Sequence, residues 1–382
     1  MAKLTWSYHQ NLQKDVGQPA TNEERLQQIS MPLEAIPASQ VLENPRETNM
    51  NDFLDEQSVQ TALHLTSNGT ATEIDGCPYE LWKALEKKYE DNVNTGKTGF
   101  NIIKVLTIVY QDIQTNGLDQ NSNFALGWMC SLYKKKDPTE ISNYRPITLL
   151  NTDYKILTKV LALRLIVEIE HLIHPDQAGF IQNRTIFNQT HLVQTIINYA
   201  ETTEENRAIV ALDQEKAYDK IKHNYLWATM EKFEIPHTFT NTIKSLYENA
   251  HTMVAINSIF SKPYKVTCGI KQGDPLSCAL FDLAIEPLAC RLRSDQRLHG
   301  YNIPGSEGKL IISLFADNTC IFLSKNDRMD NVQSILDEWC QASEARFNIG
   351  KTEIIPIGSL NHCNQVITTR KLNPLDYEGF DK

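Results

Sequence analysis

Two aspartates stand where apolar runs end, an unusual setting for a charged side chain. Asp213 directly follows the run AIVAL at residues 208–212, and Asp317 follows the run LIISLF at residues 310–315 after one alanine. Carboxylates are the ligands that Mg²⁺ prefers, and two such ions about 3.5–4 Å apart can stabilise both oxygens of a phosphoryl transfer. The pattern is compatible with a metal-dependent phosphoryl-transfer site, although either aspartate alone is more simply the first polar residue after a strand.

The second aspartate belongs to a predicted β-hairpin. The run TCIFL at residues 319–323 is again strand-like, so two strands flank a tight Ala-Asp-Asn segment. The tip of this hairpin carries Asp317 and Asn318.

The other expected elements are a mixture of helices and strands. Residues 126–133 form a short apolar run that predicts a strand, and Lys134, Lys135 and Lys136 then make a basic turn. Apolar residues at three- and four-residue spacing predict helices. These helices are expected at residues 55–65, 78–89, 100–115, 152–173, 187–200, 224–235 and 276–293.

Composition excludes several classes of protein. Of the 382 residues, 41% are hydrophobic and 22% charged, which is ordinary for a globular protein. There is no apolar run of membrane-spanning length and no signal-peptide core, so we expect neither a membrane protein nor a secreted one. The eight cysteines show no C-x-x-C spacing, which favours reduced thiols in the cytosol or nucleus.

The net charge of −10 argues against nucleic-acid binding, because such proteins usually carry a basic balance. Binding would require acidic and basic residues to segregate, with a basic groove for the phosphates.

Six segments between residues 132 and 358 carry a more specific signal. They read LYKKKDPTEISNYRPITLLNTDYKILTKVLALRL, DQAGFIQNRTIFNQ, ALDQEKAYDKI, GIKQGDPLSCALFDLAIEPL, LFADNTCIFL and RFNIGKTEIIPIG. In this order they resemble the reverse transcriptases of non-LTR (LINE-type) retrotransposons, and residues 67–85 resemble the lead-in of that family. Each segment alone is a weak signal, whereas six in order are a strong one.

The resemblance implies an α+β fold, namely the fingers and palm of a right-hand polymerase with an antiparallel palm sheet and the thumb largely missing. The segments expected are a polar linker-like region at 1–75, a helical lead-in at 76–126, fingers and palm at 127–358, and the truncated start of a thumb or connection at 359–382.

The resemblance also assigns roles to single residues. Asp213 and Asp317 would hold two Mg²⁺ ions, and Tyr218 would be the steric gate that excludes a ribose 2′-hydroxyl. Arg145 would grip the triphosphate, for which a guanidinium offers bidentate donors. Without the resemblance, Tyr218 reads as a core tyrosine and Arg145 as a surface arginine.

Three further residues receive roles in the same way. Gln272 and Gly273 would lie along the nascent base pair, and Lys351 would donate a proton near the leaving pyrophosphate. The simpler readings are a turn that starts a helix and a surface lysine.

The chain departs from the family at Asn318, where the family carries a second aspartate. Asparagine is similar in size but neutral, so it cannot balance the charge of two divalent cations. As a plain structural residue, Asn318 suits a hairpin turn. The neutral residue and the missing thumb together predict impaired or absent activity.

Two functions are therefore carried forward. The first is an RNA-directed DNA polymerase domain that uses Mg²⁺, an RNA template, a DNA primer and dNTPs. The second is a catalytically inactive retrotransposon remnant that at most binds nucleic acid. A group II intron-type maturase shares the palm, but the spacing of NYRPI and the QAGF block argues against it.

Overall fold

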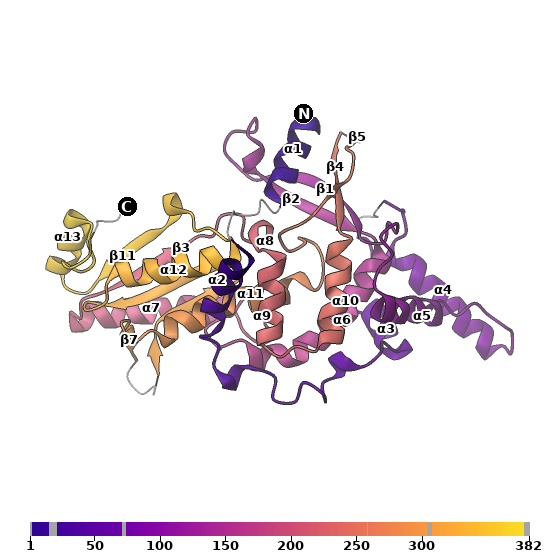
Figure 1. Cartoon of the computed structure of the whole chain (residues 1–382), viewed down its shortest axis with the longest axis horizontal. Coiled ribbons are helices and arrows are strands. Elements are labelled where there is room, and N and C mark those ends of the chain that lie inside the picture. The colour runs from indigo at the N-terminus through magenta and orange to yellow at the C-terminus, as the bar shows by residue number, and fades with distance from the viewer. Residues whose placement is uncertain (1, 15–20, 71–73, 258, 304–307, 378–382) are drawn as a thin grey trace. The chain divides into compact units, whose positions relative to one another are not determined.

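The computed structural model describes residues 2–14, 21–70, 74–257, 259–303 and 308–377 (Figure 1). Residues 71–73 of the expected lead-in and residues 378–382 of the expected C-terminal segment lie outside this part. The chain divides into two compact units. The first comprises residues 1–17, 42–168 and 234–278, and the second comprises residues 18–41, 169–233 and 279–382.

The first unit is built on a mixed sheet in the order β2-β1-β4-β5, with β6 paired to β4. The central strand β1 runs antiparallel to β2 and parallel to β4. A small apolar cluster is formed by residues in and next to β4 and β6, namely Ala250, Val254, Tyr264 and Val266. Trp6 of helix α1 packs against it. The elements are α1 (Ala2–Leu12), β1 (Leu126–Tyr133), β2 (Tyr144–Leu150), β4 (His251–Ile256), β5 (Ile259–Phe260) and β6 (Tyr264–Lys265).

Helices form the rest of the first unit, and polar caps define their ends. The Asp55 side chain accepts from the Ser58 amide at the start of one helix, and Asn101 accepts from the Lys104 amide at the start of another. Gly117, at φ +75°, ends the latter. These helices are α3 (Glu56–His64), α4 (Tyr79–Asn94), α5 (Ile102–Asn116), α10 (His237–Glu248) and the larger part of α6 (Thr152–Leu172).

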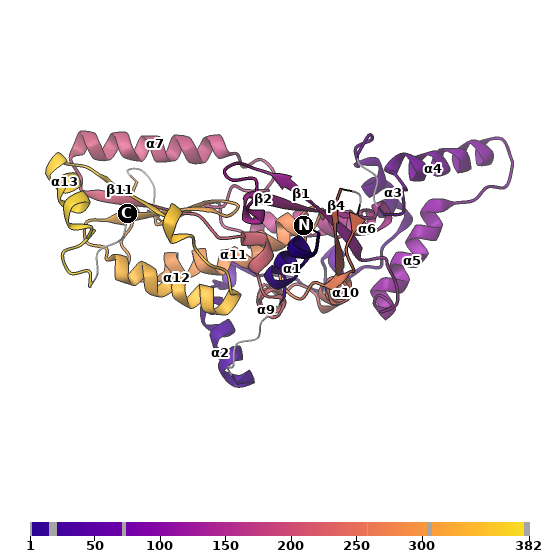
Figure 2. The ribbon, with the colours of Figure 1, turned by 90° about the horizontal axis from the view of Figure 1, so that it is seen from above.

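The second unit is built on an entirely antiparallel sheet in the order β11-β3-β10-β9. Helix α7 covers one face and helix α12 the other (Figure 2). Ile196 and Ala200 of α7 pack with Ile209, Phe322 and Ile357 of the strands. The bounds are β3 (Arg207–Leu212), β9 (Ile312–Phe315), β10 (Asn318–Ser324), β11 (Glu353–Ile357), α7 (Ile186–Thr203) and α12 (Met329–Ser343).

Further elements surround this sheet. They are α2 (Asn22–Leu33), α8 (Ala217–Lys220), α9 (His223–Lys232), α11 (Ser277–Ser294), α13 (Leu360–Thr369) and the short strand pair β7 (Tyr301–Asn302) and β8 (Lys309–Leu310). Helix α11 starts at the end of the first unit and runs into the second. The run at 310–315, expected as one strand, is divided, because Leu310 pairs with Tyr301 and β9 begins only at Ile312.

The first 75 residues contain more ordered structure than a linker. Helices α1, α2 and α3 form there, and Met50, Leu54 and Val59 are completely buried. The helix expected at residues 55–65 is present as α3. The polar sequence conceals this packing, because each helix buries only a few apolar residues among many polar ones.

Among the described helices, none combines the length and the apolar character needed to cross a bilayer.

Helix α11 buries an acidic residue of the second unit. Asp282 is 1% exposed, and neither carboxylate oxygen has a hydrogen-bond partner within the described part of the chain. Burial, reinforced by the nearby Glu286, raises the pKa of Asp282 well above its ordinary value, and Arg184 opposes this only in part. The ionised form of Asp282 is therefore a cost to the folded state.

We expect Asp282→Asn to raise the free energy of unfolding at pH 7 by about 1–3 kcal/mol, because the amide buries no charge. Since the pKa is raised in the folded chain, the penalty exists only above the unfolded-state pKa of about 3.9. The gain should therefore vanish as the pH falls toward 4. Urea unfolding at both pH values measures it, with the exposed Asp337→Asn as a control that changes little. A loss of stability at pH 7 would contradict the assignment.

Candidate active site

The register of β3 and β10 places the two carboxylate-bearing positions at one end of the sheet. Leu212, the last residue of β3, pairs with Thr319 of β10. Asp213 and Asn318 are therefore opposite each other one step further along the same ladder, where neighbouring strands lie about 4.8 Å apart. Asp317 precedes Asn318 in the turn between β9 and β10. The predicted hairpin is thus present, and it brings Asp317 and Asn318 beside Asp213.

Exposure differs along this end of the sheet. Asp213 and Asp317 are half-buried, whereas Asn318 is exposed. The aspartates can therefore reach a bound ligand while their strands stay in the core.

A second segment joins Asp213 after β3 ends. The Asn348 amide donates to the Asp213 carbonyl at 2.7 Å, and the Glu215 amide donates to the Arg346 carbonyl at 2.7 Å. This pairing carries the chain into a short turn that ends at Lys351. The Lys351 Nζ lies 2.7 Å from Oδ2 of Asp213. The expected proton donor is therefore an ion-pair partner of the first aspartate.

The expected gate residue, Tyr218, lies on the short helix α8. Its ring stacks on Phe281 at a centroid distance of 4.7 Å and an interplanar angle of 14°. The Phe180 ring meets it in a T-shaped arrangement, at a centroid distance of 6.5 Å and an interplanar angle of 86°. Tyr218 remains half-buried between these rings, so its orientation is fixed while part of its surface stays accessible.

Arg145 lies in the first unit, on β2, and its side chain is exposed. It pairs across the ladder with Leu132 of β1, next to a pair of tyrosine rings, Tyr133 and Tyr144, at 5.4 Å. The lysines at 134–136 occupy the turn between these strands, as the sequence predicts. A cationic, aromatic hairpin of this kind suits contact with phosphates and bases.

Gln272 and Gly273 lie against the same strand. The Gln272 carbonyl accepts from the Thr148 amide at 3.3 Å. Gly273 adopts φ +107°, and a Cβ there would lie 2.5 Å from the Thr148 carbonyl oxygen. Glycine is therefore required at this turn, both for its backbone conformation and for its close approach to β2.

A buried polar network flanks this turn, and the sequence did not reveal it. The Lys271 Nζ lies 3.0 Å from the Tyr154 hydroxyl, which donates to Asp274 Oδ2 at 3.1 Å. Burial lowers the pKa of Lys271 to about 8 and raises that of Asp274. The buried charges of Lys271 and Asp274 thus compensate each other through Tyr154. They flank the turn at Gln272 and Gly273 in the sequence and hold it in place.

The donor set near Asp213 fits a divalent cation in part. Two carboxylates stand at neighbouring strand ends, and hard oxygen ligands of this type suit Mg²⁺. However, Asn318 is neutral and Lys351 contacts one oxygen of Asp213. Within the described ranges, no group of three or more histidine, cysteine, aspartate or glutamate side chains is arranged to hold a metal.

A family model described as "Reverse transcriptase (RNA-dependent DNA polymerase)" matches residues 133–378. The chain belongs to the reverse transcriptase family. The matched range contains every candidate residue from Arg145 to Lys351. The mixed helices and mainly antiparallel sheets are consistent with that family.

Relatives of the chain come from non-LTR retrotransposons. The chain is 36% identical over 229 residues to "Transposon TX1 uncharacterized 149 kDa protein" of Xenopus laevis, covering 60% of this chain and 17% of that protein. It is 24% identical over 315 residues to "Probable RNA-directed DNA polymerase from transposon BS" of Drosophila melanogaster, covering 78% of this chain and 33% of that protein. The chain therefore spans a third or less of these two relatives.

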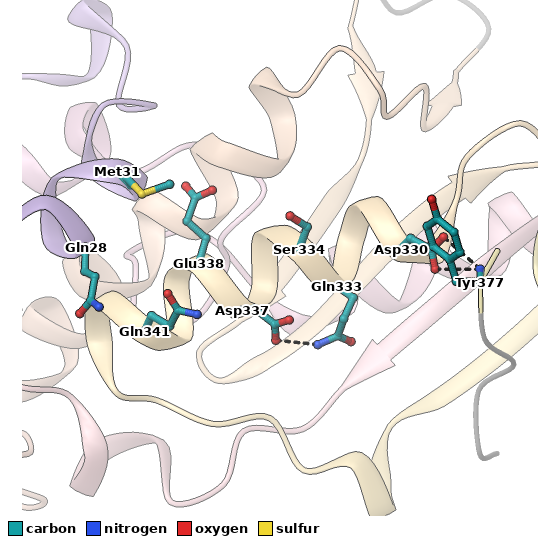
Figure 3. A pocket seen from close by; sticks show the side chains of 9 residues that line it. All are labelled: Gln28, Met31, Asp330, Gln333, Ser334, Asp337, Glu338, Gln341 and Tyr377. Atoms are coloured by element: carbon teal, nitrogen blue, oxygen red, sulfur yellow. Dashed lines mark hydrogen bonds between the residues drawn. The ribbon is translucent and has the colours of Figure 1, made fainter. Parts of the chain in front are cut away.

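A separate open pocket of about 510 Å³ lies between α2 and α12 in the second unit (Figure 3). It contains none of the candidate residues. Its carboxylates already have partners, since Asp337 accepts from Gln333 and Glu338 pairs with Arg291. An acidic lining of this kind repels phosphates, so the pocket is unsuited to nucleic acid.

Gly273→Ala should destabilise the chain by about 1–3 kcal/mol, because the new methyl group meets the Thr148 carbonyl and the residue must keep a positive φ. Thermal unfolding measures the effect. Gly308→Ala is the matched control, since nothing lies within 4 Å of its Cβ position. Equal melting temperatures for the two variants would show that the turn does not lie against β2 in solution.

Proposed function

We propose that the chain is the fingers and palm portion of an RNA-directed DNA polymerase, with Asp213 and Asp317 as its metal ligands. The observation that carries the proposal is the β3–β10 register, which sets Asp213 beside the hairpin that holds Asp317. The reaction would join a primer 3′-hydroxyl to the α-phosphate of a dNTP, with pyrophosphate leaving. Bound Mg²⁺ would neutralise the phosphates and activate the 3′-hydroxyl.

The other residues bind and orient the nucleotide. The stacked and half-buried ring of Tyr218 would press on the sugar and exclude a 2′-hydroxyl. Arg145 would hold the triphosphate, and the turn at Gln272 and Gly273 would support the nascent base pair. Lys351 contacts Asp213, so a cation that binds Oδ2 of Asp213 would have to displace the lysine.

The alternative is an inactive remnant that at most binds nucleic acid. The neutral Asn318 and the Lys351–Asp213 ion pair favour it, because both reduce the negative charge available to two divalent cations. In such a remnant, the lysines at 134–136 would contact the phosphates of the nucleic acid.

Primer extension on a homopolymer RNA template with Mg²⁺ tests the proposal. We expect Asn318→Asp to raise the extension rate by about 100-fold or more, because it restores a carboxylate where the transition state gains charge. Asp213→Ala should abolish extension both in the unsubstituted chain and in Asn318→Asp, since it removes the proposed metal ligand at the end of β3.

The outcomes separate the two functions. Extension by the unsubstituted chain that Asp213→Ala abolishes would establish that a neutral residue at 318 is tolerated. Extension only by Asn318→Asp would show that the neutral residue at 318 alone prevents activity in an otherwise competent site. The absence of extension by both the unsubstituted chain and Asn318→Asp would overturn the polymerase proposal for this chain, and RNA binding in a filter assay would then support the alternative.

A further inference from the structure

The loop at residues 176–180 runs along strand β9 in the second unit and reaches the carboxylate hairpin. The Leu314 amide donates to the Asp176 carbonyl at 2.8 Å, and the Ala178 amide donates to the Leu314 carbonyl at 2.9 Å. These bonds attach the loop to β9 as a short parallel bridge. Gly179, two residues further along the loop, lies against Ala316 of the hairpin tip.

Gln177 is completely buried and bonds to the backbone of the tip. Its Oε1 accepts from the Ala316 amide at 3.0 Å and from the Gly179 amide at 2.8 Å, and its Nε2 lies 3.4 Å from the Ala316 carbonyl. Ala316 adopts φ +55°, a left-handed conformation that costs about 1 kcal/mol for a residue with a Cβ. One side chain thus satisfies both backbone groups of the strained residue that immediately precedes Asp317.

Two other residues hold Gln177 in place. A Cβ on Gly179 would lie 2.2 Å from the Ala316 nitrogen, so the loop fits against the tip only with glycine there. The Arg184 guanidinium donates to the carbonyls of His174 at 2.7 Å and Gln177 at 2.8 Å. Arg184 therefore holds the backbone of the loop at Gln177, and Gly179 allows the loop to pack closely against the tip.

The same loop ends at the gate tyrosine. Phe180, itself at φ +58°, directs its ring at Tyr218. Two strained positions, Phe180 and Ala316, thus occur where this loop contacts candidate site residues, and such strain persists only when neighbours fix it.

We propose that Gln177 is a positioning residue that fixes the backbone of the hairpin tip and thereby orients Asp317 toward a divalent cation. The link to the cation rests on the proposed function. A metal site tolerates displacements of only about 0.5 Å, and removal of the amide would release Ala316 from its left-handed conformation.

The test compares Gln177→Met with Gln189→Met. Methionine matches glutamine in length and flexibility but cannot replace its hydrogen bonds. Gln189 is the control, because it also bonds to this region, to Ser313 and to the Asp176 carbonyl, but does not contact the tip. Amide hydrogen exchange at Ala316 reports on the tip, and Mn²⁺ binding followed by electron paramagnetic resonance reports on the site.

We expect Gln177→Met to speed exchange at Ala316 by about tenfold and to weaken Mn²⁺ binding by about tenfold, the effect of one lost buried hydrogen bond. The Gln189→Met control should stay within about twofold of the unsubstituted chain in both measurements. In the unsubstituted chain the Ala316 amide should exchange as slowly as the strand amide of Leu314, a comparison that needs no variant to fold.

Fast exchange of Ala316 in the unsubstituted chain would overturn the proposal, and so would equal effects of the two substitutions. Faster exchange with unchanged Mn²⁺ affinity would overturn the link between the tip and the cation. If the unsubstituted chain binds no Mn²⁺, the proposed metal ligands fail together with that link, whereas the exchange data still decide whether Gln177 holds the tip.

Discussion

The candidate site depends above all on the pairing of β3 with β10. Side chains alternate along a strand, so a slip of one residue would turn every core residue toward the wrong face. Here both faces of the sheet are covered, by α7 and by α12. Ile209 and Phe322, which pair with each other, pack with residues of α7. The apolar core therefore fixes the register, and the register in turn brings Asp213 to the hairpin tip.

Charge is the second constraint, because carboxylates at the end of an apolar sheet repel each other until a cation arrives. Lys351 relieves this repulsion at Asp213, and Asn318 lessens it further by being neutral. Both features stabilise the cation-free chain and oppose metal binding. The overall charge of −10 says little about this balance, since charges separated by more than about 8–10 Å are largely screened. The affinity for a cation depends instead on the side chains close to Asp213, at the ends of β3 and β9.

Local patterns in the sequence predicted the elements that are apolar and continuous. The strand at 126–133, the hairpin around Asp317 and the long helix from Thr152 follow directly from such runs. Helix α2 could not be found this way, because it is polar and contains a proline, and it is held partly by Arg25 bonding to the carbonyls of Gln341 and Ala342. The contacts of Gln177 with the hairpin tip could not be predicted either, because Ala316 lies 139 residues away in the sequence. The resemblance drew attention to the segment that contains Gln177 and Gly179. Only the contacts in the folded chain show what these two residues do.

The residues that determine the fold and those that determine the charge of the site are different ones. Asn318 takes part in the sheet through its backbone, paired with Phe315, and its exposed side chain contributes little to the core. Exchange of an amide for a carboxylate there would leave the apolar pattern intact. A chain can therefore keep the apolar strands of this sheet whether or not it polymerises. Membership of the family rests on the match over residues 133–378, whereas the proposed turnover would depend on a few oxygen atoms at the ends of β3 and β9.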